Sequence, residues 1–239
     1  MNRLRAITYG TVCETRSFLR VQKAFFFTIV FPIFLYVVFV MIWGNDTPEY
    51  SRFLLTGIIA ITVVSNSILA IGDVIVKYYE NGMFRVFKTL SYSFNYHIIS
   101  LVLSRLVMMI AATIFLLLFA LIFNHLTFTP KELLQIVCGV VSGMVLFSLI
   151  GILLGEFVES KKSENTVMNS AFYIIIFVSD SFYPVSEMNP SLSYVLNFNP
   201  ITPILNMMRG SGSYWPLFIW ISVLLVLQII GWKHLKIKR

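Results

Sequence analysis

The sequence predicts an all-α integral membrane protein with six transmembrane helices and both termini in the cytoplasm. Of its 239 residues 58% are hydrophobic and only 12% are charged, about half the charged share of a soluble protein. A helix needs about 20 mostly apolar residues to cross a hydrocarbon core of roughly 30 Å. Five of six apolar stretches approach or exceed that length, and the fifth in order is short. They lie at residues 24–43, 53–71, 98–123, 133–154, 166–183 and 215–232.

The basic residues predict the orientation of these helices. If six spans alternate from a cytoplasmic N-terminus, fourteen of the eighteen Lys and Arg residues fall inside and only Arg52, Lys131 and Arg209 fall outside. Arg105 lies within the third stretch, toward its inner end, where a long side chain can reach the interface. Cytoplasmic loops are the ones enriched in Lys and Arg. The net charge of +7 is therefore explained by topology, and nucleic acid is not expected as a partner.

The first 23 residues mix apolar and basic positions, and we expect an amphipathic helix at the inner membrane interface over residues 1–23. The alternative is a disordered basic tail. The apolar stretch that follows is 20 residues long, whereas a signal peptide has an apolar region of 7–15 residues. We therefore expect an uncleaved first span.

Residues 74–94 follow the second span on the cytoplasmic side. Apolar side chains recur there at spacings of three and four residues, and most charged ones take the opposite side. This period predicts a helix with two distinct faces. Such a helix can rest on lipid, or it can present its polar face to a cytoplasmic partner.

The fourth stretch contains glycines at four-residue spacing, Gly139 with Gly143 and Gly151 with Gly155. Small residues at this spacing let helix backbones approach closely in a membrane. We expect these glycines to serve packing within the chain rather than a dimer interface.

The fifth stretch is short and ends irregularly. Its uncharged part covers residues 166–179, Asp180 follows, and four of the eight prolines lie at 184, 190, 200 and 203. Residues 184–214 are too apolar for an exposed loop and too interrupted for one helix. Non-helical backbone at membrane depth is tolerated only where protein or a water-filled cavity covers it. We expect 184–214 to form short re-entrant helices in the outer leaflet.

No catalytic or metal-binding constellation is visible. His97, His125 and His234 fall on the inside, the outside and the C-terminal tail, so they cannot share a metal ion. No G-x-x-x-x-G-K-[ST] loop is present, so the chain itself is not expected to bind ATP or to be an enzyme. Any use of ATP and Mg²⁺ requires a partner subunit.

The arrangement resembles the membrane subunits of type-2, or G-type, ABC exporters over nearly the whole chain. One shared motif is an acid two residues before a glycine after span two, here in Lys77–Phe84. A second follows span five, with Phe182-Tyr183-Pro184, Met188-Asn189-Pro190, Asn199-Pro200 and Arg209. The chain departs from the family pattern at Asp180-Ser181, where the family commonly carries a glycine.

The resemblance implies roles for particular residues. The coupling helix that docks into the ATPase corresponds to residues 74–94, and its implied contacts are Tyr79, Glu80, Gly82, Phe84 and Arg85. Spans two and five line the pathway in the family, so the implied lining residues are Asn66, Asn169, Phe172 and Phe177. The implied outer re-entrant motif comprises Pro184, Met188, Pro190, Asn199, Pro200 and Arg209.

The function that the resemblance implies is the transmembrane subunit of an ATP-driven exporter in the bacterial plasma membrane. Two permease subunits, identical or siblings, would form the pathway between them among membrane lipids, and two ABC ATPase subunits would bind below. The aromatic content favours an amphipathic or lipophilic substrate, such as a drug, peptide or lipid-like molecule. A lipid-linked glycan is the alternative substrate. The alternative function is a non-transporting immunity or sensory subunit that captures a ligand.

Overall fold

The computed structural model describes residues 3–43, 48–83, 86–87, 94–157, 161–184 and 192–237, and all regular elements among them are helices. The bounds are α1 (Arg3–Arg20), α2 (Gln22–Phe25), the π-helical segment η1 (Phe26–Val30), α3 (Phe31–Trp43), α4 (Pro48–Val64), the π-helical segment η2 (Ser65–Leu69), α5 (Ala70–Glu80), α7 (Phe94–Asn124), α8 (Pro130–Phe157), α9 (Lys161–Phe177), α11 (Ser193–Phe198), α12 (Thr202–Arg209) and α13 (Trp215–Ile237).

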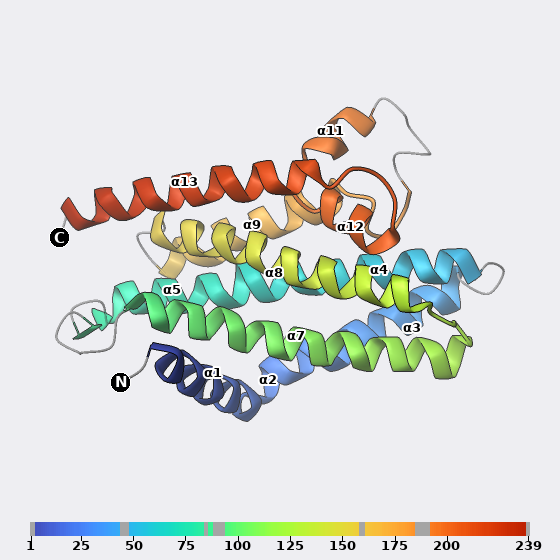
Figure 1. Cartoon of the computed structure of the whole chain (residues 1–239), viewed down its shortest axis with the longest axis horizontal. Helices are drawn as coiled ribbons and strands as arrows, with labels where there is room; N and C mark the ends of the chain where they lie inside the picture. The colour runs from blue at the N-terminus through green and yellow to red at the C-terminus, as the bar shows by residue number, and fades with distance from the viewer. Residues whose placement is uncertain are drawn as a thin grey trace.

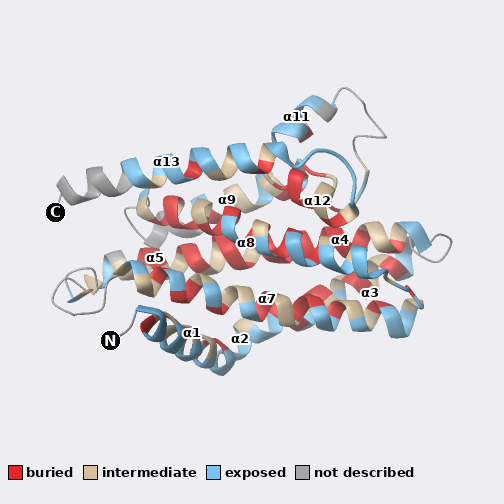
Figure 2. Ribbon diagram, viewed as in Figure 1, coloured by how far each residue is buried: buried red, intermediate tan, exposed pale blue. Residues whose placement is uncertain are grey.

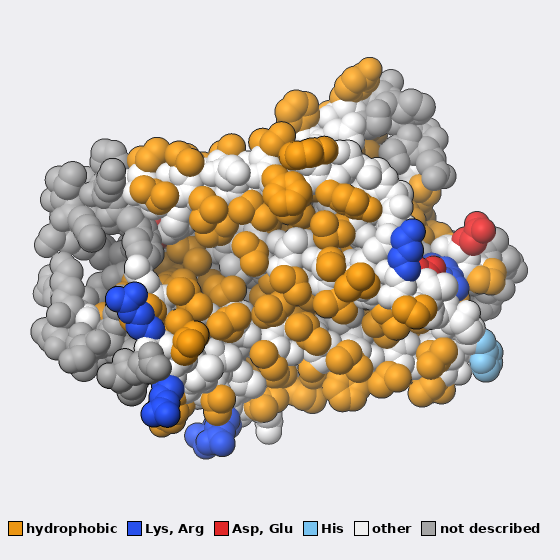
Figure 3. Space-filling model, viewed as in Figure 1, with side chains coloured by type: hydrophobic (Ala, Val, Ile, Leu, Met, Phe, Trp, Pro, Cys, Tyr) orange, Lys and Arg blue, Asp and Glu red, His pale blue; other side chains and the backbone are white. Residues whose placement is uncertain are grey.

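The long helices lie side by side along the length of the molecule (Figure 1). Within the described residues four helices are long and apolar enough to cross a membrane, at Gln22–Ile42, Pro48–Tyr78, Phe94–Asn124 and Pro130–Phe157. The apolar parts of α9 and α13 are shorter. On the face seen in Figure 3, apolar side chains cover the middle, and the charged side chains lie near the two ends. This distribution is that of a multi-pass membrane protein.

The start of α1 and the end of α13 lie at the same end of the bundle, here called the terminal end (Figure 1). The short helices α11 and α12 lie toward the opposite end. Helix α1 crosses the beginning of α7, where the Thr15 hydroxyl donates to Ser104 Oγ at 3.0 Å and the Ser100 hydroxyl donates to the Ile7 carbonyl at 3.1 Å. These contacts attach α1 to the bundle.

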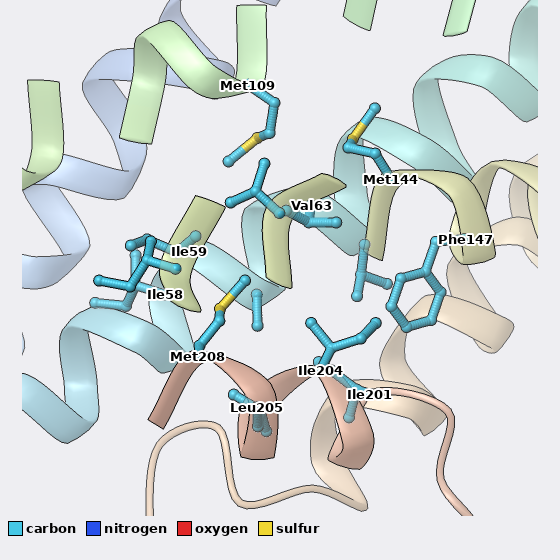
Figure 4. Close-up of a cluster of buried hydrophobic side chains, with 14 of the residues drawn as sticks. Ile58, Ile59, Val63, Met109, Met144, Phe147, Ile201, Ile204, Leu205 and Met208 are labelled. Carbon is cyan, nitrogen blue, oxygen red and sulfur yellow. The ribbon is translucent and has the colours of Figure 1, made fainter. Parts of the chain in front are cut away.

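Helix α4 is the centre of the bundle. In the most apolar 18 residues of the span that α4 begins, Pro48–Tyr78, 78% of the residues are buried, against 33% in α7, and Figure 2 shows the same contrast in colour. The core around it draws side chains from α4, α7, α8 and α12 (Figure 4). Lipid tails are as apolar as these side chains, so the core is held by close packing rather than by exclusion of water.

The four glycines of α8 face neighbouring segments of the same chain. A Cβ on Gly139 would meet Met208, one on Gly143 would meet Val63, one on Gly151 would meet Ser67 O at 2.6 Å, and one on Gly155 would meet Ile75. The prediction that these glycines serve packing within the chain is confirmed. The glycine stripe lets α8 lie directly against α4, η2, α5 and α12.

Helix α8 begins at Pro130, three residues before the apolar stretch 133–154, with its first turn capped by side chains. The Thr129 hydroxyl accepts from the Glu132 backbone N–H at 3.3 Å, and Glu132 Oε2 accepts from the Thr129 N–H at 2.7 Å. This is a capping box with proline at the first helical position. Arg52 of α4 pairs with Glu132 at 2.8 Å, which ties the beginnings of α4 and α8 together at the end opposite the terminal end.

The predicted two-faced helix of residues 74–94 lies partly outside the described residues, and its first part continues the second span. Helices α4, η2 and α5 form one continuous helix from Pro48 to Glu80, so the first third of residues 74–94 extends the second span. The helix gives way to a turn at Asn81–Gly82, where Gly82 has φ +64°. Glycine adopts this left-handed conformation without a Cβ penalty, and it is the residue that commonly follows a helix end.

Candidate functional site

A cavity of about 720 Å³ opens between α1, the first and second long helices, α7 and α9. Its charged lining residues are Glu14, Lys23, Asp73, Lys77 and Arg105, and its polar ones are Ser17, Thr28, Ser65 and Asn66. The apolar lining residues are Phe18, Val21, Ala24, Phe27, Phe31, Leu69, Ala70, Val74 and Phe172.

The cavity has a charged end and an apolar end because of the directions of its helices. The first long helix runs away from the terminal end, so Lys23 precedes Phe27 and Phe31 along it. The second runs back toward the terminal end, so Asp73 and Lys77 lie beyond Leu69. The charges thus gather toward the terminal end and the aromatic rings toward the middle of the bundle.

Two π-helical segments meet at the inner wall of this cavity. Thr28 lies in η1 and Asn66 in η2, and the Thr28 hydroxyl donates to Asn66 Oδ1 at 3.0 Å. Asn66 Nδ2 donates to the Thr62 carbonyl at 3.0 Å, so both ends of this buried amide are used. Single π turns inside α-helices occur frequently at functional sites.

The charged end contains one closed ion pair. Lys77 pairs with Asp73 one turn away on α5. Glu14 of α1 lies 3.9 Å from His97 Nε2, and the Tyr78 hydroxyl lies 2.6 Å from the same nitrogen. These groups join α1, α5 and α7 behind the cavity wall.

Arg105 of α7 is less well satisfied. Its guanidinium carbon lies 4.3 Å from the centre of the Phe18 ring, in a cation–π contact. Its Nε and Nη1 atoms are buried, and neither has a hydrogen-bond partner among the described residues. Arg105 thus lines the cavity while two of its guanidinium nitrogens are buried and unpaired within the part of the chain that the structure describes.

The structure brings two of the four implied lining residues to this cavity. Asn66 and Phe172 lie on its wall. Asn169 is half-buried on α9 and Phe177 is 77% exposed at the end of α9, and neither lines the cavity. Phe177 therefore takes another face of the helix that carries Phe172, whereas Asn169 lies one turn before Phe172 and does not reach the cavity.

The implied coupling residues lie at and after the end of α5. Tyr79 is in its last turn, Glu80 is exposed at its end, and Gly82 forms the turn. Phe84 and Arg85 lie outside the described residues. The charged end of the cavity, at Asp73 and Lys77, is one to three helical turns from this segment along α5.

Two residues of the implied outer motif hold the irregular backbone after α9. Asn199 Nδ2 donates to the Ile175 carbonyl at 2.7 Å and also to the Val178 carbonyl. Arg209 donates to the Asp180 carbonyl at 2.8 Å and to Thr56 Oγ1 at 3.1 Å. Carbonyls that α9 leaves unpaired at its end thus find donors within the protein, as non-helical backbone at membrane depth requires.

The remaining members of that motif are less informative. Pro184 ends the described part of the segment after α9, and Pro200 follows Asn199 in the turn before α12. Met188 and Pro190 lie outside the described residues. Helices α11 and α12 are the two described helices of residues 184–214, and α12 packs on α8 and α4.

Sequence reasoning did not select Thr28, Phe27, Phe31, Glu14 or Lys23 as site residues. A threonine within an apolar stretch was the available signal for Thr28, because a buried hydroxyl needs a partner. In the described part of the chain, no group of three His, Cys, Asp or Glu side chains could hold a metal ion.

The chain was compared with models of known protein families. The family model described as ABC-2 type transporter matches residues 6–211, which reach from the first turn of α1 to just past the end of α12. No curated protein matches the chain.

Proposed function

The chain belongs to the ABC-2 type transporter family of membrane permeases, and from that premise we propose that it exports an amphipathic or lipophilic substrate from the cytoplasm. As a family member it is the membrane part of an ABC transporter and not its ATPase. The proposed energy source is ATP, bound with Mg²⁺ and hydrolysed by the ABC ATPase partner that the family implies.

The cavity is the observation that carries this proposal. It combines five charged residues at one end with Phe27, Phe31 and Phe172 toward the middle. Its volume of about 720 Å³ falls in the range typical of small-molecule sites, roughly 300–1,000 Å³. A molecule with one polar end and one apolar end fits such a lining better than a fully polar one does.

We further propose six spans with both termini in the cytoplasm of a bacterial cell. In this topology the terminal end of the bundle is cytoplasmic, and α9 and α13 are the fifth and sixth spans. The apolar part of α9, Thr166–Phe177, is about 18 Å long at 1.5 Å per residue. The non-helical residues that Asn199 and Arg209 hold would complete the crossing.

The proposed contact with the ATPase is the turn at the end of α5, with Glu80 exposed beside Gly82. A second copy of the permease, or a sibling chain, would complete the pathway, and two ATPase subunits would serve the pair. Closure of the ATPases on ATP would move the two turns and switch the pathway from inward-facing to outward-facing.

A pull-down from native membranes tests the proposal. The tagged chain is solubilised in detergent and in nanodiscs, and the recovered proteins are identified by mass spectrometry and assayed for ATPase activity. We expect a stoichiometric ABC ATPase with vanadate-sensitive activity, absent from a control with an unrelated multi-pass protein bearing the same tag. Recovery of the chain without any ATPase under all conditions would refute the exporter and favour a ligand-capturing subunit.

A further inference from the structure

We infer that the charged end of the cavity is a binding site for the phosphate or carboxylate head group of an amphipathic ligand, with Arg105 as its principal contact. The identification of that ligand as exported cargo rests on the proposed function. The binding site itself does not, because it follows from the cavity and its charges.

Arg105 provides the first argument. Its Nε and Nη1 atoms are buried without a hydrogen-bond partner in the described residues. A buried donor that has lost water and found no acceptor is unfavourable, and more so when it is charged. An anion bound beside Arg105, which lines the cavity, would offset this buried positive charge. Arginine presents its donors in a planar fork that matches carboxylate and phosphate oxygens.

The other charged residues of the cavity do not pair with Arg105. The cavity lining carries three cations, Lys23, Lys77 and Arg105, and two acids, Glu14 and Asp73, which leaves one excess positive charge. Asp73 is engaged by Lys77, and Glu14 lies beside His97. No ion pair joins either acid to Arg105 within the described residues.

The Phe18 ring fixes how Arg105 meets a ligand. The ring lies 4.3 Å from the guanidinium carbon, and this cation–π contact positions the guanidinium at the cavity wall. Phe18 is itself buried between α1 and the bundle. The guanidinium is therefore held in place before any ligand arrives.

The aromatic part of the cavity provides the tail site. Phe27, Phe31 and Leu69 lie farther from the terminal end than the charged groups, and Phe172 closes the wall from α9. A head group at Arg105 would place an attached hydrocarbon chain along these residues. A cationic amphiphile could use the same rings, but its head would meet the excess positive charge.

Two probes with the same tail test the head-group preference. Dodecyl phosphate and dodecyltrimethylammonium are titrated against the purified full-length chain in a neutral detergent, and binding is followed by intrinsic tryptophan fluorescence. We expect wild-type protein to bind the phosphate at least about tenfold more tightly than the ammonium. Equal affinity for the two probes, or preference for the cation, would overturn the inference.

Substitutions then locate the site. Arg105→Gln should weaken binding of dodecyl phosphate by about tenfold or more, the usual loss for a charged hydrogen bond, and leave binding of the ammonium unchanged or stronger. Arg105→Lys keeps the charge without the fork and should give a smaller loss. Arg52→Gln, at the opposite end of the bundle, is the matched control and should change neither probe. If Arg105→Gln does not fold, the inference is judged from two results: the loss of phosphate affinity in Arg105→Lys, and the preference of the wild type for phosphate over ammonium.

The source of the ligand is decided by two further readouts. Native mass spectrometry of protein from native membranes would show a retained phospholipid in wild type and its loss in Arg105→Gln if the ligand is a resident lipid. Stimulation of the ATPase complex by dodecyl phosphate, lost in Arg105→Gln, would identify the ligand as cargo. Because the titration uses this chain alone, a failed ATPase pull-down leaves its result standing, and an unselective titration leaves the ATPase partnership standing.

Discussion

The Thr28 hydroxyl donates to Asn66 Oδ1 at 3.0 Å, and each residue lies in a π-helical segment of its own long helix. The two segments therefore meet at the same depth, on the inner wall of the cavity. A π turn adds one residue to the helical repeat and changes which side chains face a neighbour. This contact is the polar connection between the first and second long helices in the apolar middle of the bundle.

We expect this hydrogen bond to show measurable coupling. A double-mutant cycle with Thr28→Val and Asn66→Leu should give an interaction free energy of about 0.6 kcal/mol and no more than about 1.7 kcal/mol, the average and the maximum for hydrogen bonds between membrane helices. The measurement is reversible unfolding in mixed micelles. Thr28→Val combined with Ser142→Ala, whose hydroxyl bonds within its own helix, is the control and should be additive. Additive free energies for Thr28 and Asn66 would contradict the expectation.

The glycine stripe of α8 predicts an order of destabilisation. Gly151→Ala places a Cβ 2.6 Å from the Ser67 carbonyl, which is backbone and cannot turn aside, whereas Gly143→Ala places one 3.0 Å from a Val63 methyl, which can move. Overpacking typically costs about 1–3 kcal/mol. Gly151→Ala should therefore unfold at lower denaturant than Gly143→Ala, and the reverse order would disprove this account of the close approach.

The turn at the end of α5 predicts which substitutions uncouple the transporter. Gly82 has φ +64°, whereas proline is fixed near −65°, so Gly82→Pro must break the turn. Gly82→Pro and Glu80→Ala should express normally but reduce substrate-stimulated ATPase activity by about tenfold, within the usual range of coupling free energies. Gly82→Asn is the matched control, since asparagine tolerates positive φ. Normal stimulated turnover in both uncoupling variants would rule out a coupling role.

The two natural cysteines test the topology. Cys13 and Cys138 are both free and exposed, Cys13 on α1 and Cys138 in the apolar part of α8. A membrane-impermeant maleimide should label Cys13 in inverted vesicles and not in intact cells, and Cys138 in neither, because the reagent does not enter the lipid around the apolar part of α8. Ser211→Cys, on the loop after α12, should give the opposite pattern to Cys13. Labelling of Cys13 in intact cells would invert the proposed orientation.

Hydropathy and spacing predicted the helical membrane fold because both depend on residue type alone. The first four apolar stretches each lie within a long helix. The glycines of the fourth pack closely against neighbouring helices, as their four-residue spacing predicts. Asn199 and Arg209 were selected as a motif, and the structure adds the physical reason, since both donate to carbonyls at the end of α9.

The rotation of each helix could not be predicted in the same way. A uniformly apolar helix shows no polar face, so Phe172 could not be distinguished from Phe177 before packing was known. The hydrogen bond between Thr28 and Asn66 depends on two π turns, which no residue pattern announces. The end of α5 depends on the backbone conformation at Gly82. The spacing of apolar residues continues unchanged across this turn, so the sequence pattern does not reveal where the helix ends.

The unbroken helix from Pro48 to Glu80 connects the two ends of the bundle through a single element. At 1.5 Å per residue it is about 50 Å long. Arg209 donates a hydrogen bond to Thr56 near its first end, and the turn at Gly82 follows its last residue. A displacement of Glu80 would therefore move this helix along its axis, without passing through flexible loops. The segment of that helix that departs from the regular α-helical hydrogen-bond pattern is η2, beside the cavity, so strain in the helix would be released at the proposed ligand site.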